Sequence, residues 1–174
     1  MSSPAVEFVQ LVKECEPEGL SEHNGKRLAG EIARIFEVKS DEVAILKIER
    51  GALHFVYPHQ LRAVGNIPLS TASSVAVRTA NTQCAETINN FAQVKHASIF
   101  ESPNVGVHIT EARKRDEYVI QKLISAPVVS GTDVLGVIQV SRKGASPESA
   151  GPDFTPMDLQ RLVGIAVSMP GCFK

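Results

Sequence analysis

Two strand–turn–strand patterns constrain the fold of this chain more than any other feature of its sequence. In the first, the apolar segment Val43–Ile48 is followed by a turn at Gly51 and by a segment of alternating apolar residues. In the second, the segment 118–130 is followed by a turn at Gly131 and by the apolar run Val134–Val140. Such runs, bounded by residues that favour turns, are typical of β-hairpins. The sequence therefore predicts an antiparallel sheet that contains two hairpins.

Amphipathic helices are predicted at both ends of the chain. The segment Pro4–Cys15 places apolar residues at helical spacing, and Ser21 is a suitable cap for a second amphipathic helix. Near the other end, Thr155 followed by Pro156 is typical of a helix start, and Asp158 has the spacing of a capping box. Because one side of each helix is apolar, a sheet or a partner chain must cover that side. The apolar face predicted for the last helix consists of Leu159, Leu162, Val163, Ala166 and Val167.

The middle of the chain is predicted to hold one short helix between long loops. Residues 73–82 have a helical pattern that turns Thr79 inward and Arg78 toward water. An irregular stretch over 58–70 precedes this helix, and residues 83–116 contain short polar pieces that indicate brief strands or turns separated by loops. Long loops inside a compact domain are usually functional or mobile, so a site is expected in this part of the chain.

Composition and charge narrow the classes of partner. The chain has 174 residues, of which 43% are hydrophobic and 21% charged, and its formal net charge is −1. A domain of this size buries a core that needs no disulfide or metal. Acidic residues flank the basic cluster Arg113–Arg115, so nucleic-acid binding is not expected. No stretch approaches the roughly 20 apolar residues that span a bilayer, and the N-terminus lacks a signal pattern, so a cytoplasmic protein without membrane contact is expected.

Short motifs, in this order along the chain, resemble the GAF domain family. Each motif is short, but together they cover nearly the whole chain, from about residue 20 to residue 169. They are Ile67–Leu69 with residues 73–79, which resembles the approach to the short pocket helix of the family; Ile124–Val128 with Gly131 and Val134–Val140, which looks like its last strand pair; and Phe154–Leu159, which is similar to the start of its last helix.

The resemblance implies an α+β fold. A central antiparallel sheet of five or six strands would carry the terminal helices on one face, and short helices and loops would form a small-molecule pocket on the other. One domain is expected over residues 1–174, with an N-terminal helix and linker over 1–19, a core over 20–169 and a tail over 170–174. Fold alone does not fix function, so each site needs its own argument.

The resemblance also implies a non-enzymatic regulatory domain that senses a small molecule and acts in trans on a signalling partner. Dimerisation through the terminal helices is expected, and no cofactor is expected. Hydroxyl and amide groups among apolar walls orient small ligands, and an arginine suits an anionic group. The ordinary alternative is that the polar residues of the middle segment, which are given in the next sentence, belong to turns and to the helix surface. The candidate ligand-binding residues are Ser73, Ser74, Arg78, Thr79, Asn89, Asn90 and Tyr118.

One further pair is suggested by relatives that bind cyclic nucleotides. Lys143 and Asp158 occupy the positions of a signature lysine and aspartate, so a salt bridge between a strand end and the start of the last helix is expected. Arg142 and Leu159 stand where the signature has asparagine and glutamate, which puts cyclic-nucleotide binding in doubt. The simpler interpretation of Asp158 is a helix cap alone.

The three cysteines suggest two enzymatic or cofactor-bearing alternatives. Relatives that attach a bilin usually have histidine after the cysteine, whereas Ala85 follows Cys84 here. Relatives that reduce free methionine sulfoxide need two converging thiols. Cys15 lies in the first predicted helix and Cys172 in the tail, away from the expected pocket. A reductase and a ligand-free dimerisation module therefore stand as the alternatives to a sensor.

No metal site is expected from the remaining polar residues. Acidic residues and cysteines lack ligand spacing with the histidines, which are interpreted as surface or edge residues. The adjacent carboxylates Asp41 and Glu42 are expected to point apart into solvent. The histidines considered are His54, His59, His96 and His108.

Overall fold

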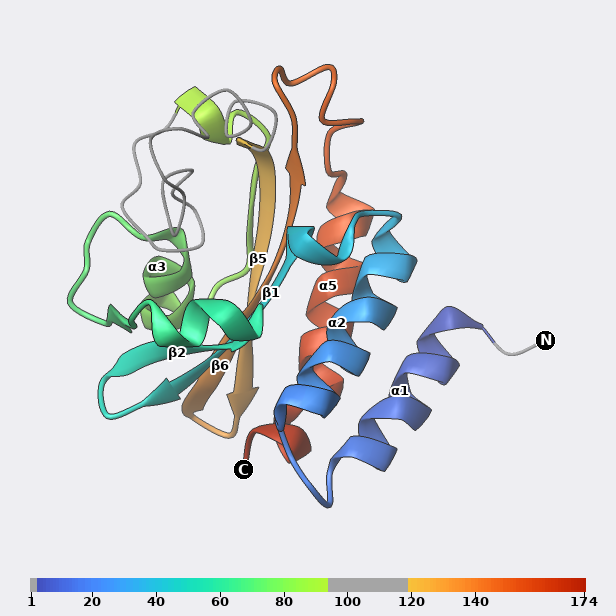
Figure 1. Cartoon of the computed structure of the whole chain (residues 1–174), viewed down its shortest axis with the longest axis vertical. Coiled ribbons are helices and arrows are strands. Elements are labelled where there is room, and N and C mark those ends of the chain that lie inside the picture. The colour runs from blue at the N-terminus through green and yellow to red at the C-terminus, as the bar shows by residue number, and fades with distance from the viewer. Residues whose placement is uncertain (1–2, 94–118) are drawn as a thin grey trace.

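The computed structural model describes residues 3–93 and 119–174, which form a six-stranded antiparallel sheet between two unequal layers (Figure 1). The order of strands across the sheet is β3-β2-β1-β6-β5-β4. The α+β class and the expected sheet are thereby confirmed. The strands are β1 (Val43–Glu49), β2 (Ala52–Tyr57), β3 (Ile67–Pro68), β4 (Glu86–Ile88), β5 (Ile120–Ser130) and β6 (Asp133–Lys143).

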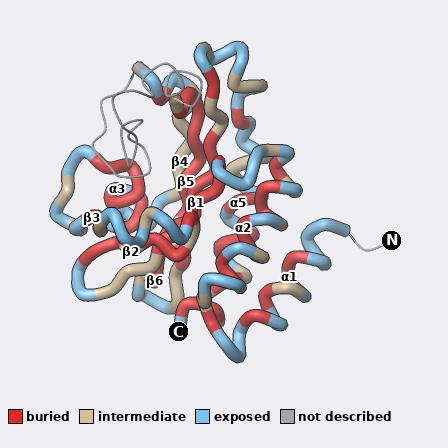
Figure 2. The backbone as a smooth tube through the Cα atoms, in the orientation of Figure 1, coloured by how far each residue is buried: buried red, intermediate tan, exposed pale blue. Residues whose placement is uncertain are grey.

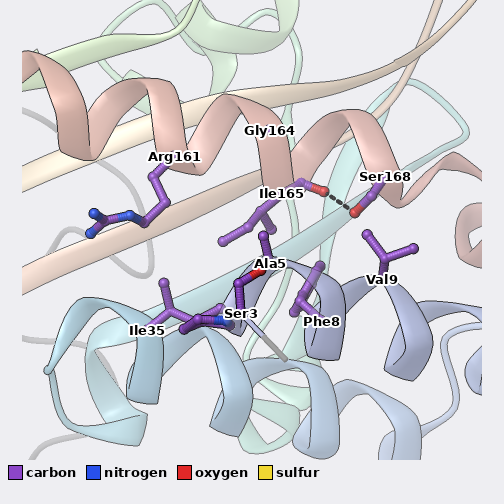
Figure 3. Close-up of a pocket in the computed structure, with 10 residues that line it drawn as sticks. Ser3, Ala5, Phe8, Val9, Ile35, Arg161, Gly164, Ile165 and Ser168 are labelled. Carbon is purple, nitrogen blue, oxygen red and sulfur yellow. Dashed lines mark hydrogen bonds between the residues drawn. The ribbon is translucent and has the colours of Figure 1, made fainter. Parts of the chain in front are cut away.

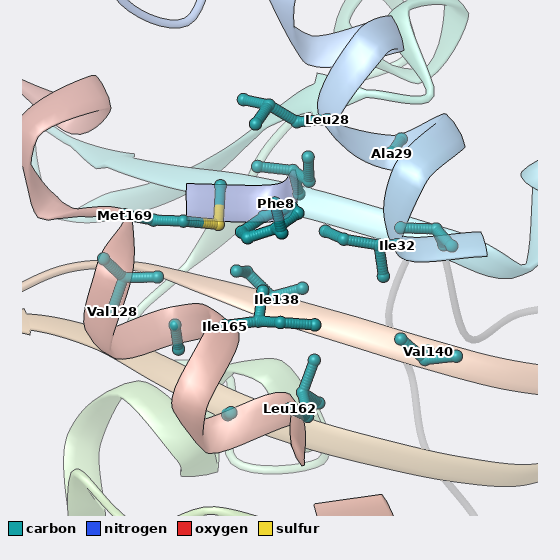
Figure 4. Close-up of a cluster of buried hydrophobic side chains, with 14 of the residues drawn as sticks. Phe8, Leu28, Ala29, Ile32, Val128, Ile138, Val140, Leu162, Ile165 and Met169 are labelled. Carbon is teal, nitrogen blue, oxygen red and sulfur yellow. The ribbon is translucent and has the colours of Figure 1, made fainter. Parts of the chain in front are cut away.

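Three helices cover one face of the sheet, and a short helix lies on the other face (Figure 1). Burial is concentrated in the strands and in the helix sides that face them (Figure 2). On the side of the three helices, a large apolar cluster includes Phe8, Leu28, Ile32, Ile138 and Leu162 (Figure 4). The helices of this layer are α1 (Pro4–Cys15), α2 (Glu22–Phe36) and α5 (Pro156–Ser168), and the short helix opposite is α3 (Val75–Thr82).

The predicted helix caps are confirmed. The Ser21 hydroxyl accepts a hydrogen bond from the backbone of Asn24 at 3.1 Å. At the start of α5, the Thr155 hydroxyl accepts from the Asp158 backbone at 3.1 Å, and the Asp158 carboxylate accepts from the Thr155 backbone at 2.8 Å. Each cap satisfies a backbone N–H that has no partner within the first helical turn.

The apolar face predicted for α5 is partly wrong. Leu162 and Ala166 are buried as expected, but Val163 is 38% exposed and Val167 is 71% exposed. Ile165 is buried in their place because residues spaced by three and four share one side of a helix. The two valines therefore form part of an apolar surface that this protomer does not cover.

Both hairpins form with two-residue turns at the predicted glycines. Gly51 has φ of 75° and Gly131 has φ of 64°, in the region that glycine adopts without strain. Pro127 lies opposite Val137 on β6, beyond the stretch of β5 that pairs with β4. Its missing N–H is tolerated there, as it is at the edge of a sheet.

The last residues pack against the sheet and the helix layer. A 3-10 helical turn over Pro170–Phe173 buries Cys172 and Phe173. A Cβ atom at Gly136 of β6 would overlap the carbonyl oxygen of Leu46 and the ring of Phe173, so only glycine fits there. Among the helices of the described residues, none is long and apolar enough to cross a membrane.

Candidate functional site

A short row of buried polar side chains lies beneath α3. The Thr79 hydroxyl donates to the carbonyl oxygen of Val75 at 2.9 Å, and its oxygen lies 2.8 Å from the hydroxyl oxygen of Ser125. The amide of Gln139 donates to the same serine oxygen at 3.3 Å. Thr79 and Ser125 are fully buried and Gln139 is 1% exposed. The row joins α3 to β5 and β6 through groups that carry no charge.

The register of the sheet brings this row together. Ser125 on β5 lies directly opposite Gln139 on β6, and successive side chains of a strand point to opposite faces. The neighbours Ile124 and Ala126 therefore pack into the cluster of the three helices, while Ser125 faces α3. In each strand a polar residue stands between two apolar ones, and this pattern is the sequence signal that marks Ser125 and Gln139.

Apolar side chains surround the row on the α3 face and form a second buried cluster, separate from that of the three helices. Phe91 and Ile120, the buried residues nearest to either end of the segment 94–118, both belong to this second cluster. The ring of Phe91 is 4% exposed. An apolar wall with a few hydrogen-bonding groups is the usual lining of a small-molecule site. The cluster also contains Leu46, Leu53, Phe55, Val75, Val77, Leu123 and Val137.

Two of the predicted ligand-binding residues are buried, one within α3 and one at its start. Thr79 belongs to the polar row, and Ser74 is fully buried as the cap of α3, accepting from the Val77 backbone at 3.3 Å. Ser73 lies just before this cap and is exposed. The sequence therefore located the α3 part of the row and missed its two strand residues.

Other predicted residues have structural partners on the outside of the domain. Arg78 is exposed and donates two hydrogen bonds to Glu86, at 2.8 and 2.9 Å. Asn89 forms a two-way clamp with the backbone of Phe154, donating at 3.0 Å and accepting at 2.9 Å. Asn90 is exposed beside it. Tyr118 lies outside the described residues.

The expected salt bridge between Lys143 and Asp158 is not among the ion pairs of the described residues. The Lys143 ammonium donates to the carbonyl oxygen of Asp41 at 2.9 Å, and burial lowers the pKa of this lysine. The Asp158 carboxylate serves the helix cap and lies 3.7 Å from Arg161. The simpler interpretation of Asp158 as a cap therefore describes its contacts.

A different ion pair links the sheet to the loop before α5. Lys122 of β5 has a side chain that is 6% exposed and lies 2.8 Å from the carboxylate of Asp153. The same ammonium donates to the carbonyl oxygen of Gly151 at 2.7 Å. Sequence spacing gave no indication of this pair, because the loop that carries Asp153 folds back over the strand.

The expectation that Glu42 lies in solvent is wrong. Glu42 is 6% exposed, and its carboxylate accepts from the backbone of Lys39 at 2.8 Å and of Lys143 at 2.6 Å. These bonds fasten the start of β1 to the end of β6. Asp41 is exposed, as expected.

The cysteines lie on opposite sides of the molecule. Cys84 is exposed after α3, where its thiol donates to the carbonyl oxygen of Thr82 at 3.3 Å. Cys15 and Cys172 are buried in the cluster of the three helices. Cys84 therefore has no second cysteine on its own side of the sheet.

The histidines of the described part of the chain have no metal-binding arrangement. A ring nitrogen of His54 lies 3.2 Å from the carbonyl oxygen of Glu49, and His59 lies 3.4 Å from the carboxylate of Glu22. Within the described residues, no group of three potential ligands converges. His96 and His108 lie outside those residues.

A groove of about 520 Å³ opens in the helix layer, between α1, α2 and α5 (Figure 3). Its apolar lining includes Phe8, Ile35 and Ile165, with Arg161 at its edge. Exposed valines lie on the two helices beside it: Val6 and Val9 on α1, and Val163 and Val167 on α5.

No protein-family model and no curated protein sequence matches the chain. Solved structures do match it over nearly its whole length. The GAF domain of a phosphoenolpyruvate-protein phosphotransferase from Acinetobacter has a TM-score of 0.66 at 13% identity, with 99% of this chain and 94% of that chain covered. The corresponding GAF domain from Coxiella burnetii has a TM-score of 0.62 at 9% identity, with 96% and 92% covered.

An enzyme shares the same architecture. The free methionine-R-sulfoxide reductase of Neisseria meningitidis has a TM-score of 0.59 at 14% identity, with 99% of this chain and 92% of that chain covered. Because one fold hosts several functions, likeness at these identities concerns the fold and not the activity. The resemblance seen in the sequence is confirmed at this level: the chain has the fold of a GAF domain.

Proposed function

We propose that this chain is a non-enzymatic regulatory domain that senses a small molecule on the α3 face of its sheet and acts on a signalling partner. The observation that carries the proposal is the buried row Thr79, Ser125 and Gln139 within an apolar cluster. Polar groups buried in a core normally serve a structural or binding purpose, since desolvating them is unfavourable.

The charge of the row limits the class of ligand. Thr79, Ser125 and Gln139 are neutral, and each can donate and accept hydrogen bonds. Arg78, the nearby cation on α3, is already bound by Glu86 in a two-bond pair. The favoured ligand is therefore a small molecule with an uncharged hydrogen-bonding edge, such as an amide, a nucleobase or a hydroxylated ring.

The same strands offer a route for the signal. Ser125 lies between Ile124 and Ala126, which pack on the opposite face against the helix layer. A ligand that moves Ser125 and Gln139 would therefore also move side chains that support α5. Such a shift requires that the ligand bind one arrangement of the strands better than the other.

A thermal-melt screen tests the proposal. The panel holds cyclic and ordinary nucleotides, nucleosides, amino acids including methionine sulfoxide, 2-oxo acids, haem and bilins. A compound that binds only the folded state at 100 times its Kd adds about 2.7 kcal/mol, enough to raise Tm by several degrees. The shift should disappear in Thr79→Val and persist in the matched control Thr132→Ala, which changes an exposed turn residue. An undiminished shift in Thr79→Val would contradict the site.

A second role, self-association through the helix layer, is favoured by the groove and its valines. Val163 and Val167 are exposed on α5, one of the helices that line the groove, so two copies related by a two-fold axis could pair through their helix layers. Two ion pairs on this side, Glu7 with Arg34 and Glu14 with Arg27, neutralise charge within the protomer. They lower the like-charge repulsion that a second copy would meet.

Sedimentation velocity tests this association. The unchanged protein is expected to be a dimer, and Val167→Glu is expected to be a monomer, because the charge would be buried without a partner. Val64→Glu is the matched control, since Val64 is also exposed (51%) but lies on the other side of the domain, after β2. A monomer in the unchanged protein, or an unaffected dimer in Val167→Glu, would remove this role.

The arrangement of thiols does not favour the reductase alternative. Attack on sulfur and resolution of the resulting bond need two thiols in one place, whereas Cys84 is separated from the other two cysteines by the sheet. An assay with free methionine sulfoxide and a thiol reductant decides the point. Turnover that is lost in Cys84→Ser would favour the enzyme over the sensor.

A further inference from the structure

Two buried thiols from opposite ends of the chain share one packing site. Cys15 is the last residue of α1, and Cys172 lies in the 3-10 turn that ends the chain. Cys15 is fully buried and Cys172 is 1% exposed, both within the cluster of the three helices. Nothing in the proposed sensing or dimerisation role uses either group.

Backbone contacts place Cys172 against the last turns of α1. Its thiol donates to the carbonyl oxygen of Val12 at 3.5 Å, and Val12 is one helical turn before Cys15 on the same buried side. The preceding residue, Gly171, packs on Glu16: a Cβ there would lie 2.7 Å from the glutamate oxygen. Cys172 and its neighbour thus contact α1 on either side of Cys15 along the chain.

The turn after α1 also packs against both cysteines. The backbone of Gly19 donates to the carbonyl oxygen of Cys15 at 2.8 Å, and a Cβ at Gly19 would lie 3.4 Å from the carbonyl oxygen of Cys172. Both cysteines are therefore held beside one short stretch of backbone.

The electrostatics agree with this proximity. Burial raises the pKa of the Cys15 thiol and raises that of Cys172 to about 11. Negative charge on Cys15 contributes to the shift at Cys172. Both groups are thus mainly protonated thiols at neutral pH, in contrast to a reactive thiolate at an exposed site.

We propose that Cys15 and Cys172 form a redox pair, which a two-electron oxidant such as a low-molecular-weight disulfide converts into an intramolecular disulfide that ties α1 to the end of the chain. One thiol loses its proton and attacks the oxidant disulfide, which releases one thiolate and leaves a mixed disulfide. The second thiol then loses its proton and displaces the other half. Two S–H bonds are lost, one S–S bond forms, and the oxidant becomes two thiols.

The disulfide would fix the position of α1. The bond closes a loop that contains nearly the whole chain, which restricts the unfolded ensemble and stabilises the folded state. In the folded state it joins α1 to the segment whose Phe173 covers Gly136 of β6. Oxidation would therefore hold the peripheral helix α1 against the 3-10 turn and the rest of the helix layer.

The test uses the full chain with Cys84→Ser, which removes the exposed thiol and keeps the pair. After equilibration with oxidised glutathione, the intact mass should fall by two hydrogen atoms, and a non-reducing peptide map should contain Cys15 joined to Cys172. Tm should rise by several degrees, and dithiothreitol should reverse both changes. Cys84→Ser with Cys172→Ala should show no such loss of hydrogen.

Three results would overturn the pair: two thiols that remain free after equilibration, glutathione that stays attached to either cysteine without closure, and disulfides that form only between chains. Circular dichroism before oxidation establishes that the Cys84→Ser protein is folded, so a negative result counts against a redox pair in the folded state.

Discussion

The two faces of the sheet are built from the same strands but differ in what they bury. On the helix side, β5 and β6 contribute Ile124, Ala126 and Ile138 to a cluster without polar strand residues between them. On the α3 side, the same strands contribute Ser125, which hydrogen-bonds to Thr79, and Gln139, which donates to Ser125. Strand alternation thus lets one sheet carry a stabilising face and a binding face. Changes on the first should mainly alter stability, and changes on the second should mainly alter ligand response.

The largest effect is expected from Leu162→Ala on the helix side. Leu162 is fully buried, so the change removes apolar contacts and leaves a cavity that destabilises the protein by about 2–5 kcal/mol. Urea unfolding measures this loss. Val167→Ala on the same helix should stay within about 0.5 kcal/mol, because its side chain is exposed. Equal losses in the two variants would contradict the packing of α5.

Thr79→Val on the α3 side should destabilise the protein less than Leu162→Ala does, and it should disturb ligand binding more. The change keeps the shape of the side chain but removes the hydroxyl that bonds to Ser125. Ser125 then loses a buried partner, which should lower the free energy of unfolding by about 1–3 kcal/mol. Its thermal response to the compound panel should vanish, whereas Leu162→Ala should keep that response at its lower Tm. A comparison of both variants therefore separates a binding defect from a general loss of stability.

High pH should reduce the contribution that Cys172, on the helix side, makes to the free energy of unfolding. Its pKa is raised from 9.0 to about 11 in the folded state, so the unfolded state loses the proton first as pH rises. The stability linked to this thiol is complete below pH 9 and is lost through about pH 11.

Urea unfolding at several pH values measures this effect under reducing conditions. The difference in free energy of unfolding between the unchanged protein and Cys172→Ala should shrink by up to about 2 kcal/mol across that range. A constant difference would indicate that the thiol is not buried as the structure has it.

The smallest effect is expected from Arg78→Ala. The pair of Arg78 with Glu86 is partly exposed, and such surface pairs contribute less than about 1 kcal/mol. If the ligand is uncharged, as the polar row indicates, the thermal response to the panel should be retained. Loss of that response in Arg78→Ala would instead favour an anionic ligand and would move the site to the outer side of α3.

Local patterns predicted the elements of this fold well. The cap residues Ser21 and Thr155 and the turn glycines Gly51 and Gly131 all act within a few residues of chain, so their effects could be inferred from spacing. The burial of Val163 and Val167 was wrongly predicted, because an apolar residue at the edge of a helix stripe can face either the core or the surface.

The spacing of residues in the sequence could not predict contacts between distant segments. Asp158 was expected to bind Lys143, but the long loop before α5 supplies Asp153 to Lys122 instead. Cys15 and Cys172 are far apart in the sequence, but the segments that carry them meet in the fold. Ser125 was missed because its partner Thr79 comes from another element, and only the packing of α3 on the sheet brings the two hydroxyls together.

Hydrogen–deuterium exchange tests the division between the two faces most directly. It would be measured with and without the panel compound that gives the largest rise in Tm. Added protection is expected in α3 and in the parts of β5 and β6 around Ser125 and Gln139, and it should be absent in Thr79→Val. Protection confined to α1 and α5, around the groove of the helix layer, would contradict a binding site on the α3 face.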